Sequence, residues 1–167
     1  DIKITTCSDD YKLVKLGDLC EIECGFAFKS TEFTDTGIPI LKIKDLKNNI
    51  LNLNTIDTYT KKIINDKYKI KKNDIIISMT GKEGSIVSAA LSNKNLNIYI
   101  NQRNCALRNI KINLNYFYFV FCKYAKKHLD FKNTGSIQVH ISPTDINETY
   151  IPIPKDDKKL EHWVNTI

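Results

Sequence analysis

The sequence GSIQVHISPTDINETYIPIP, residues 135–154, decides how this chain folds. In its first part, apolar residues alternate with polar ones as far as Ile141, which is the period of a half-buried strand. Gln138 and His140 occupy polar positions of this strand. Successive side chains of a strand point to opposite faces, so both residues are expected to point outward.

A short capped helix and an edge strand complete this stretch. Ser142 offers a hydroxyl as helix cap, Pro143 suits the first helical position, and Asp145 occupies the capping-box position. The segment Ile-Pro-Ile-Pro at 151–154 follows. Because proline lacks a backbone N–H, this segment is expected at a sheet edge or at the exit from a domain.

The residues upstream predict a sheet covered by a helix. Residues 74–79, Asp-Ile-Ile-Ile-Ser-Met, contain a continuous β-branched run typical of a strand buried on both faces. Residues 96–107 supply one or two further strands, and apolar residues at helical spacing predict a helix over 113–129. Thr60 is expected to cap one or two helical turns over residues 61–68.

Length and composition indicate one domain with a core of its own. The chain has 167 residues, of which 42% are hydrophobic. No apolar run approaches the roughly 20 residues of a membrane-spanning helix, and the N-terminus lacks a signal pattern, so we expect a cytoplasmic protein without membrane association. The five cysteines are an odd set, and Cys20 and Cys24 do not form a Cys-x-x-Cys pair, which favours reduced thiols over disulfides or zinc.

The chain is basic. Its net charge of +6 suits a polyanionic partner such as nucleic acid. The sequence is also rich in lysine, asparagine and isoleucine, which are the residues that AT-rich codons supply. Part of the basicity therefore reflects composition, and the charge is only mild support for nucleic-acid binding.

Motifs for catalysis and cofactor binding are missing from the sequence. The six glycines are nowhere spaced as Gly-x-Gly-x-x-Gly, Gly81-Lys82 lacks the upstream glycine of a P-loop, and no Asn-Pro-Pro-Tyr-like methyltransferase loop occurs. Three Asp-x-Lys triplets, which start at Asp45, Asp130 and Asp156, mimic part of a nuclease site, as chance produces in a lysine-rich chain. The three histidines lack ligand spacing. We therefore expect a non-catalytic protein with no cofactor and no metal.

Further motifs follow one another in a fixed order along the chain. They are VKLGDL at 14–19, GFAFKSTEF at 25–33, GIPILKIKDL at 37–46, DIIIS at 74–78 with Gly81 and Gly84 after it, and INQR at 100–103. Together with the closing GSIQ and IPIP motifs, they resemble the target recognition domain of the DNA specificity subunit of type I restriction-modification enzymes. The resemblance covers nearly the whole chain from Tyr11 onward, and the order of the motifs carries it.

This resemblance implies a fold, a function and partners. The fold would be α/β (α+β), a mixed, mostly antiparallel β-sheet domain with a few packed helices. Residues 1–154 would form the recognition domain, and residues 155–167 the start of a conserved spacer and dimerisation helix. The domain would recognise double-stranded DNA and direct adenine methylation and restriction by a methyltransferase subunit and a restriction subunit. Self-association would run through the C-terminal helix.

Residues in or beside loops, at positions that the family pattern marks, are candidates for DNA contact. They are Lys29, Ser30, Lys82, Arg103, Gln138 and His140. Lysine and arginine neutralise phosphates, whereas glutamine pairs with adenine and arginine with guanine through two-pronged hydrogen bonds. Gln102 and Arg103 are equally suited to hold the loop backbone, and the alternative for His140 is a surface histidine without DNA contact.

Two other functions stay open on the sequence. The chain also fits the C-terminal recognition domain of a single-chain type II restriction-modification enzyme that is fused to its own methyltransferase. A different class is a non-catalytic module that binds RNA or a protein partner, with its lysines serving solubility.

Overall fold

The secondary structure consists of short strands, short turns of helix and one longer helical segment. The computed structural model describes residues 10–81, 87–131 and 139–156. The strands are β1 (Tyr11–Lys15), β2 (Glu21–Cys24), β3 (Ile38–Leu41), β4 (Leu46–Lys47), β5 (Ile50–Leu51), β6 (Tyr59–Thr60), β7 (Ile75–Ser78), β8 (Thr80–Gly81), β9 (Ala89–Leu91), β10 (Tyr99–Ile100), β11 (Asn104–Arg108), β12 (Val139–His140) and β13 (Tyr150–Pro154). The α-helices are α1 (Leu16–Leu19), α2 (Leu114–Val120), α3 (Lys126–Phe131) and α4 (Pro143–Asn147). The 3-10 turns are η1 (Ser30–Glu32), η2 (Ile43–Asp45), η3 (Leu53–Thr55) and η4 (Asp66–Tyr68), and η5 (Phe121–Ala125) is a π-helical stretch.

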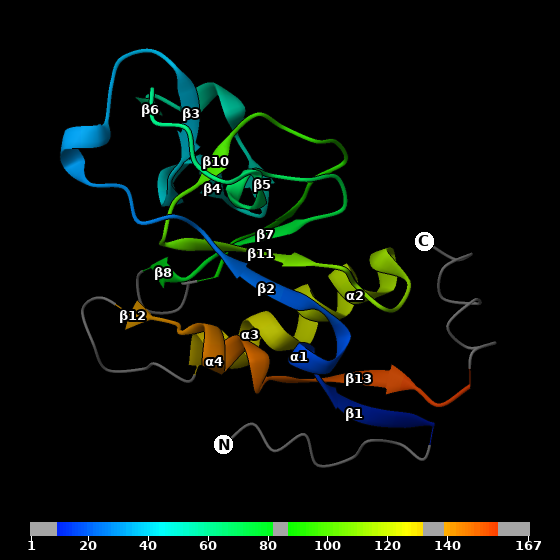
Figure 1. Cartoon of the computed structure of the whole chain (residues 1–167). Coiled ribbons are helices and arrows are strands. Elements are labelled where there is room, and N and C mark those ends of the chain that lie inside the picture. The colour runs from blue at the N-terminus through cyan, green and yellow to red at the C-terminus, as the bar shows by residue number, and fades with distance from the viewer. Residues whose placement is uncertain (1–9, 82–86, 132–138, 157–167) are drawn as a thin grey trace.

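The centre of the molecule is a four-stranded antiparallel sheet in the order β2-β11-β7-β9 (Figure 1). Both faces of its strand β7 are buried. Ile75 and Ile77 belong to the large core, while Ile76 belongs to a second core together with Leu41 and Ala106. The strand buried on both faces that the β-branched run predicts is therefore confirmed.

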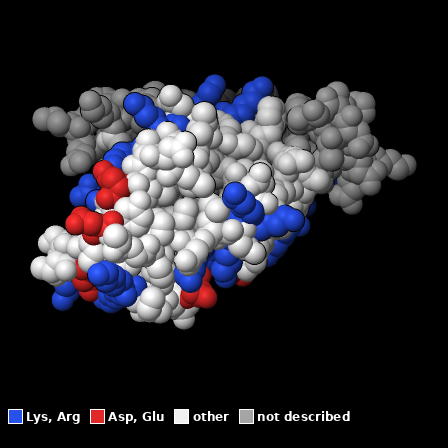
Figure 2. All heavy atoms as spheres, turned by 90° about the horizontal axis from the view of Figure 1, so that it is seen from above, with Lys and Arg blue, Asp and Glu red and all other residues white. Residues whose placement is uncertain are grey.

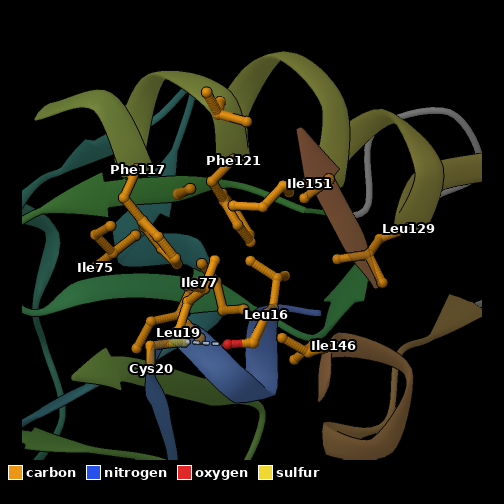
Figure 3. Packing of buried hydrophobic residues seen from close by; sticks show 14 of the residues in the cluster. Leu16, Leu19, Cys20, Ile75, Ile77, Phe117, Phe121, Leu129, Ile146 and Ile151 are labelled. Atoms are coloured by element: carbon orange, nitrogen blue, oxygen red, sulfur yellow. Dashed lines mark hydrogen bonds between the residues drawn. The ribbon is translucent and has the colours of Figure 1, made fainter. Parts of the chain in front are cut away.

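A continuous helical segment of α2, η5 and α3 packs on the large core. It begins after Asn113, whose side-chain oxygen accepts the backbone N–H groups of Asn115 and Tyr116. Phe117 and Phe121 are fully buried, with ring centroids 6.5 Å apart, and point toward the sheet (Figure 3). The predicted helix is confirmed. Among the described residues, no helix is long and apolar enough to cross a membrane.

Strands β10, β3 and β6 form a smaller sheet with an aromatic core of its own (Figure 1). Phe28, Ile40 and Tyr99 are buried there, and the ring of Phe26 lies edge-on to Phe28 with centroids 4.9 Å apart. Strands β3 and β10 run parallel, whereas the other strand pairs of the described chain are antiparallel. The fold is thus the mixed, mostly antiparallel α/β class that we expected.

The guanidinium of Arg108 forms a buried ion pair and also connects turn η4 to the central sheet. The Nε of Arg108 lies 2.9 and 3.1 Å from the two carboxylate oxygens of Asp74. The same guanidinium donates to the carbonyl oxygens of Lys67 and Lys69. Only 7% of Arg108 and 2% of Asp74 is exposed, so each charge depends on the other for compensation.

The two ends of the described chain meet in a two-stranded antiparallel ribbon of β1 and β13 (Figure 1). Ile151 and Ile153 are buried in the large core. Because this ribbon has only two strands among the described residues, β13 is an edge strand, which confirms the position predicted for the proline-bounded segment. Helix α4 precedes this strand. Its Asp145 N–H donates to the Ser142 hydroxyl at 3.1 Å, and the Ser142 N–H donates to the Asp145 carboxylate at 3.0 Å. The predicted capping box is confirmed as well.

The helical turns predicted after Thr60 are wrong for most of their length. Thr60 lies in β6, where it pairs with Ile38, and residues 61–65 form no helix. The turn η4 alone is helical in this segment. Its cap is Asn65, whose side-chain oxygen accepts the Lys67 N–H at 2.8 Å. Strand pairing with β3 has overridden the local helical signal.

Candidate nucleic-acid interface

Two of the six predicted contact residues meet at one hollow in the surface. Arg103 and His140 line a hollow of about 420 Å³ together with Thr80 and Gln102. Gln102, Arg103 and His140 are exposed, whereas only 7% of Thr80 is exposed. The hollow therefore has a buried hydroxyl at its wall and three polar side chains that reach solvent.

Two buried amides hold the turn that presents Gln102 and Arg103. The backbone of this turn closes with a hydrogen bond of 3.0 Å from the Asn104 N–H to the Asn101 carbonyl oxygen. The side-chain oxygen of Asn101 accepts the Arg103 N–H at 3.1 Å and the Nδ2 of Asn104 at 2.9 Å. Only 8% of Asn101 and 0% of Asn104 is exposed. The exposed tip of the turn is thus supported by two buried, hydrogen-bonded asparagine side chains.

The backbone of Met79 joins the three segments that form the hollow. Its N–H donates to the Arg103 carbonyl oxygen at 2.9 Å, and its carbonyl oxygen accepts the Ile141 N–H at 2.8 Å. Immediately beyond, β8 pairs with β12, so that Thr80 stands opposite His140. The relative position of the turn and of the two strands is therefore set by backbone hydrogen bonds.

Thr80 orients the imidazole of His140. The hydroxyl oxygen of Thr80 lies 3.1 Å from His140 Nδ1. Neither residue has a further side-chain hydrogen bond to another described residue. His140 is exposed and Ile141 is 1% exposed, which confirms the outward orientation predicted for the histidine.

Lys29 and Ser30 lie elsewhere, at turn η1. The Lys29 N–H donates to the Glu32 carboxylate at 2.9 Å, and Lys62 Nζ lies 2.5 Å from the same carboxylate. These hydrogen bonds, the one from Lys62 foremost, lower the pKa of Glu32. Lys29 and Ser30 are exposed but are not among the described residues that line the hollow. In Figure 1, η1 and the ribbon of β8 and β12 both project on the left of the view.

Lys82 and Gln138 fall outside the described residues. Each is nevertheless the sequence neighbour of a residue in the β8–β12 ribbon. Gly81 precedes Lys82 and stands opposite Val139, which follows Gln138. The ribbon therefore places the two points at which the chain runs on to these residues side by side.

The sequence did not predict Thr80, Asn101 or Asn104 as parts of the site. Asparagine at the first position of a β-turn is a common signal, so Asn101 could have been found by its place before Gln102 and Arg103. Thr80 carries no such signal, because its contact with His140 joins residues 60 positions apart.

Basic side chains are spread over the surface. Figure 2 looks from the side on which β3 and β6 lie and shows lysines and arginines in several groups around a largely uncharged centre, with acidic residues among them. Several lysines are ion-paired, for example Lys44 with Asp57 at 2.5 Å and Lys67 with Glu23 at 3.1 Å. The net charge therefore does not by itself locate the site.

Within the described ranges, no group of three or more His, Cys, Asp or Glu side chains is arranged to hold a metal ion. The acidic residues of two nuclease-like triplets have structural partners instead. The Asp45 carboxylate accepts the Lys42 N–H and the Thr55 hydroxyl, each at 2.8 Å. The Asp130 carboxylate accepts the Val87 N–H at 2.9 Å. Both carboxylates brace loops.

Sequence comparison links the chain to one family. The family model described as the type I restriction modification DNA specificity domain matches residues 8–163. Among curated proteins, the chain is similar to the specificity subunit of the type I restriction enzyme EcoBI from Escherichia coli. The two are 28% identical over 151 residues, which is 87% of this chain and 29% of that subunit.

Structural comparison gives the same fold in solved proteins. The HsdS subunit from Thermoanaerobacter tengcongensis matches with a TM-score of 0.66 and 17% identity over 98% of this chain. The type I restriction-modification S subunit from M. genitalium matches with a TM-score of 0.63 and 18% identity over 97% of this chain. The chain spans 39% of each of these two structures and less than a third of the EcoBI subunit.

Proposed function

The chain belongs to the family of type I restriction-modification DNA specificity domains, and we propose on this basis that it reads one half of a bipartite sequence in duplex DNA. The observation that carries the proposal is the hollow at which Arg103 and His140 meet beside Gln102. Planar polar side chains of this kind match the hydrogen-bonding edges of bases in the major groove. Their position on a turn and a strand fixed by backbone hydrogen bonds suits a task that depends on geometry.

The domain contributes binding, and its partners contribute chemistry. We assign it to a specificity subunit that directs adenine methylation by a methyltransferase subunit and cleavage by a restriction subunit, in the cytoplasm. The domain itself is non-catalytic and needs no cofactor. The carboxylates of Asp45 and Asp130 are engaged with loop backbone, which supports this division of labour.

Residues 1–154 form the recognition domain in this proposal, and residues 155–167 begin the helix that spaces recognition domains and mediates self-association. The pairing of β13 with β1 supports a boundary at this point, because it brings the two ends of the described domain together. Apolar residues at helical spacing begin at Leu160 in the sequence, although they lie outside the described residues.

The predicted contact residues divide into two roles. Lys29, Ser30 and Lys82 position the domain on phosphates, which sets its register on the duplex without reading sequence. Arg103, Gln138 and His140 read base edges. The exposed position of η1, apart from the hollow, supports the first role for Lys29 and Ser30, and the hollow supports the second role for Arg103 and His140.

Sequencing of methylated sites in cells that carry either the intact gene or a variant of it tests this proposal. Gln138→Ala is expected to relax base preference at one position, at a cost of roughly 1–3 kcal/mol in discrimination. Lys82→Ala is the matched control, and it is expected to weaken binding to all sequences and to flatten its salt dependence. An unchanged motif with unchanged occupancy in Gln138→Ala would remove Gln138 from the reading edge.

Gel-shift competition between duplex DNA and single-stranded RNA across a salt series tests the class of ligand. We expect the duplex to compete far better at every salt concentration. A preference for single-stranded RNA would defeat the proposal, because base edges in the major groove of a duplex would then not be the ligand.

A further inference from the structure

We propose that the hollow lined by Thr80, Gln102, Arg103 and His140 reads a guanine, and that Thr80 is the positioning residue that makes His140 a hydrogen-bond donor. This inference rests on the proposed function, since it names the base that the DNA-reading surface selects. Guanine presents two acceptors, O6 and N7, in the major groove, whereas adenine and cytosine each present an amino group there. Thymine presents one acceptor, O4, beside a methyl group, so two neighbouring donors, on Arg103 and His140, select guanine with its two acceptors.

The first donor follows from the environment of Thr80. Its hydroxyl is nearly buried, and among the described residues its one hydrogen-bond partner is His140 Nδ1, at 3.1 Å. A buried hydroxyl that donates its proton nowhere is costly. The Thr80 proton therefore points to Nδ1, which makes Nδ1 the acceptor. In a neutral imidazole the other nitrogen then carries the proton, so Nε2 faces the ligand as a donor.

The second donor is Arg103. A guanidinium carries five N–H groups and no acceptor. The side chain of Arg103 is exposed and forms no hydrogen bond or ion pair with the residues that the structure describes, while its backbone is held on both sides by Asn101 and Met79. The backbone of the arginine is fixed, and its donors are not engaged by any described residue. Arginine with guanine O6 and N7 is the commonest specific contact in the major groove.

A DNA phosphate also presents only acceptors, so the donors alone do not distinguish a phosphate from guanine. The way in which the protein holds these donors does. The four described residues that line the hollow are Thr80, Gln102, Arg103 and His140. They stand on a closed β-turn and a paired strand, and the neutral amide of Gln102 lies beside Arg103. Mobile lysine side chains suffice for phosphates, whereas a base edge needs donors held in fixed positions. The geometry favours the base over the phosphate.

The test uses the natural polypeptide and the duplex that it selects from random sequence. Each guanine of the half-site is replaced in turn by 7-deazaguanine, which lacks the N7 acceptor. Inosine is the matched control, because it keeps O6 and N7 and lacks only the minor-groove amino group. We expect 7-deazaguanine at one position to weaken binding by about fivefold or more, and inosine there to bind nearly as guanine does.

Variants of the protein assign that loss to the hollow. In His140→Ala and Arg103→Ala, the penalty for 7-deazaguanine at that position should largely disappear, because the lost acceptor no longer has its donor. Thr80→Val removes the hydroxyl at nearly constant volume and should reduce the penalty as well. Thr80→Ser keeps the hydroxyl and should show the same 7-deazaguanine penalty as the wild type. A purely structural role for Thr80 would lower binding to all duplexes alike and leave the penalty intact.

The outcomes separate this inference from the proposed function. A selected half-site without guanine, or a 7-deazaguanine penalty that His140→Ala and Arg103→Ala both leave unchanged, would overturn the inference while sequence-specific duplex binding persists. Equal weakening on every sequence together with a flatter salt dependence would assign the hollow to a phosphate and would also overturn it. Failure of the wild-type protein to bind any duplex would contradict the proposed function itself.

Discussion

Single buried side chains determine how accurately the exposed tip of the 101–104 turn is placed. Asn101 and Asn104 are asparagines in a place where apolar residues usually pack, and their amides hydrogen-bond each other and the turn. The Oδ1 of Asn104 has no hydrogen-bond partner among the described residues. A buried polar network of this kind costs stability if any member is removed, and in return it fixes one conformation of the turn.

The thiol of Cys20 links stability to alkaline pH. Burial raises the pKa of Cys20 to about 12, and the thiol also donates to the Leu16 carbonyl oxygen at 3.3 Å (Figure 3). The pKa of an unfolded thiol is about 8.5. A raised folded-state pKa gives stability that is complete below the unfolded value and is lost as pH rises toward the folded value. Unfolding free energy should therefore fall between about pH 8.5 and pH 12.

Urea unfolding of the wild type and of Cys20→Ala at pH 8 and pH 10 checks this expectation. Because one such group contributes at most about 1.4 kcal/mol per pH unit, the wild type should lose about 1–2 kcal/mol more than the variant over this interval. Equal losses in the two proteins would show that the Cys20 thiol ionises as readily in the folded state as in the unfolded state.

At the scale of elements, helix α4 connects the strand that carries His140 to the ribbon at the end of the domain. Ser142→Ala removes the hydroxyl that accepts the Asp145 N–H, and should cost about 1 kcal/mol of unfolding free energy. The matched control is Thr144→Ala, which alters an exposed residue of the same helix without removing its cap. Urea midpoints that fall equally in both variants would contradict a capping role for Ser142.

Elements with local signals could be predicted from the sequence, and elements made by distant pairing could not. The cap of α4 and the aromatic stripe of the long helix depend on neighbours within a few residues, so they can be predicted from Ser142 and Phe117. Thr60 carries an equally good local cap signal, yet it pairs with Ile38 in a strand. That choice is made by tertiary packing, which outweighs local propensity.

The candidate site divides in the same way. Arg103 and His140 were predicted because their residue types suit base edges and lie at positions that the family pattern marks. Their meeting at one hollow depends on Met79, whose backbone joins both segments. Thr80 escaped prediction, since a threonine in a buried run usually serves packing and its partner lies far along the chain.

At the scale of the whole molecule, ion pairs determine which basic residues are available to a polyanion, whereas the sequence gives only their net charge. Lys44 lies 2.5 Å from Asp57, so its charge is largely offset. Lys29 forms no ion pair with any described residue and is exposed at η1, where its charge acts on the Glu32 carboxylate only through a weaker Coulombic interaction. The basic residues behind the net charge of +6 therefore differ in how well they can bind a polyanion.

This difference predicts the salt dependence of DNA binding. Each phosphate that a protein neutralises adds about 0.9 to the magnitude of the slope of log K against log salt concentration, because counterions are released. Lys29→Ala should therefore lower that magnitude by roughly 1 and weaken binding to all duplex sequences alike. Lys44→Ala removes the same charge from an ion-paired position and should leave the slope nearly unchanged. Titrations at several salt concentrations decide the matter, and equal changes in both variants would show that the domain meets DNA through its overall charge, without a defined contact at η1.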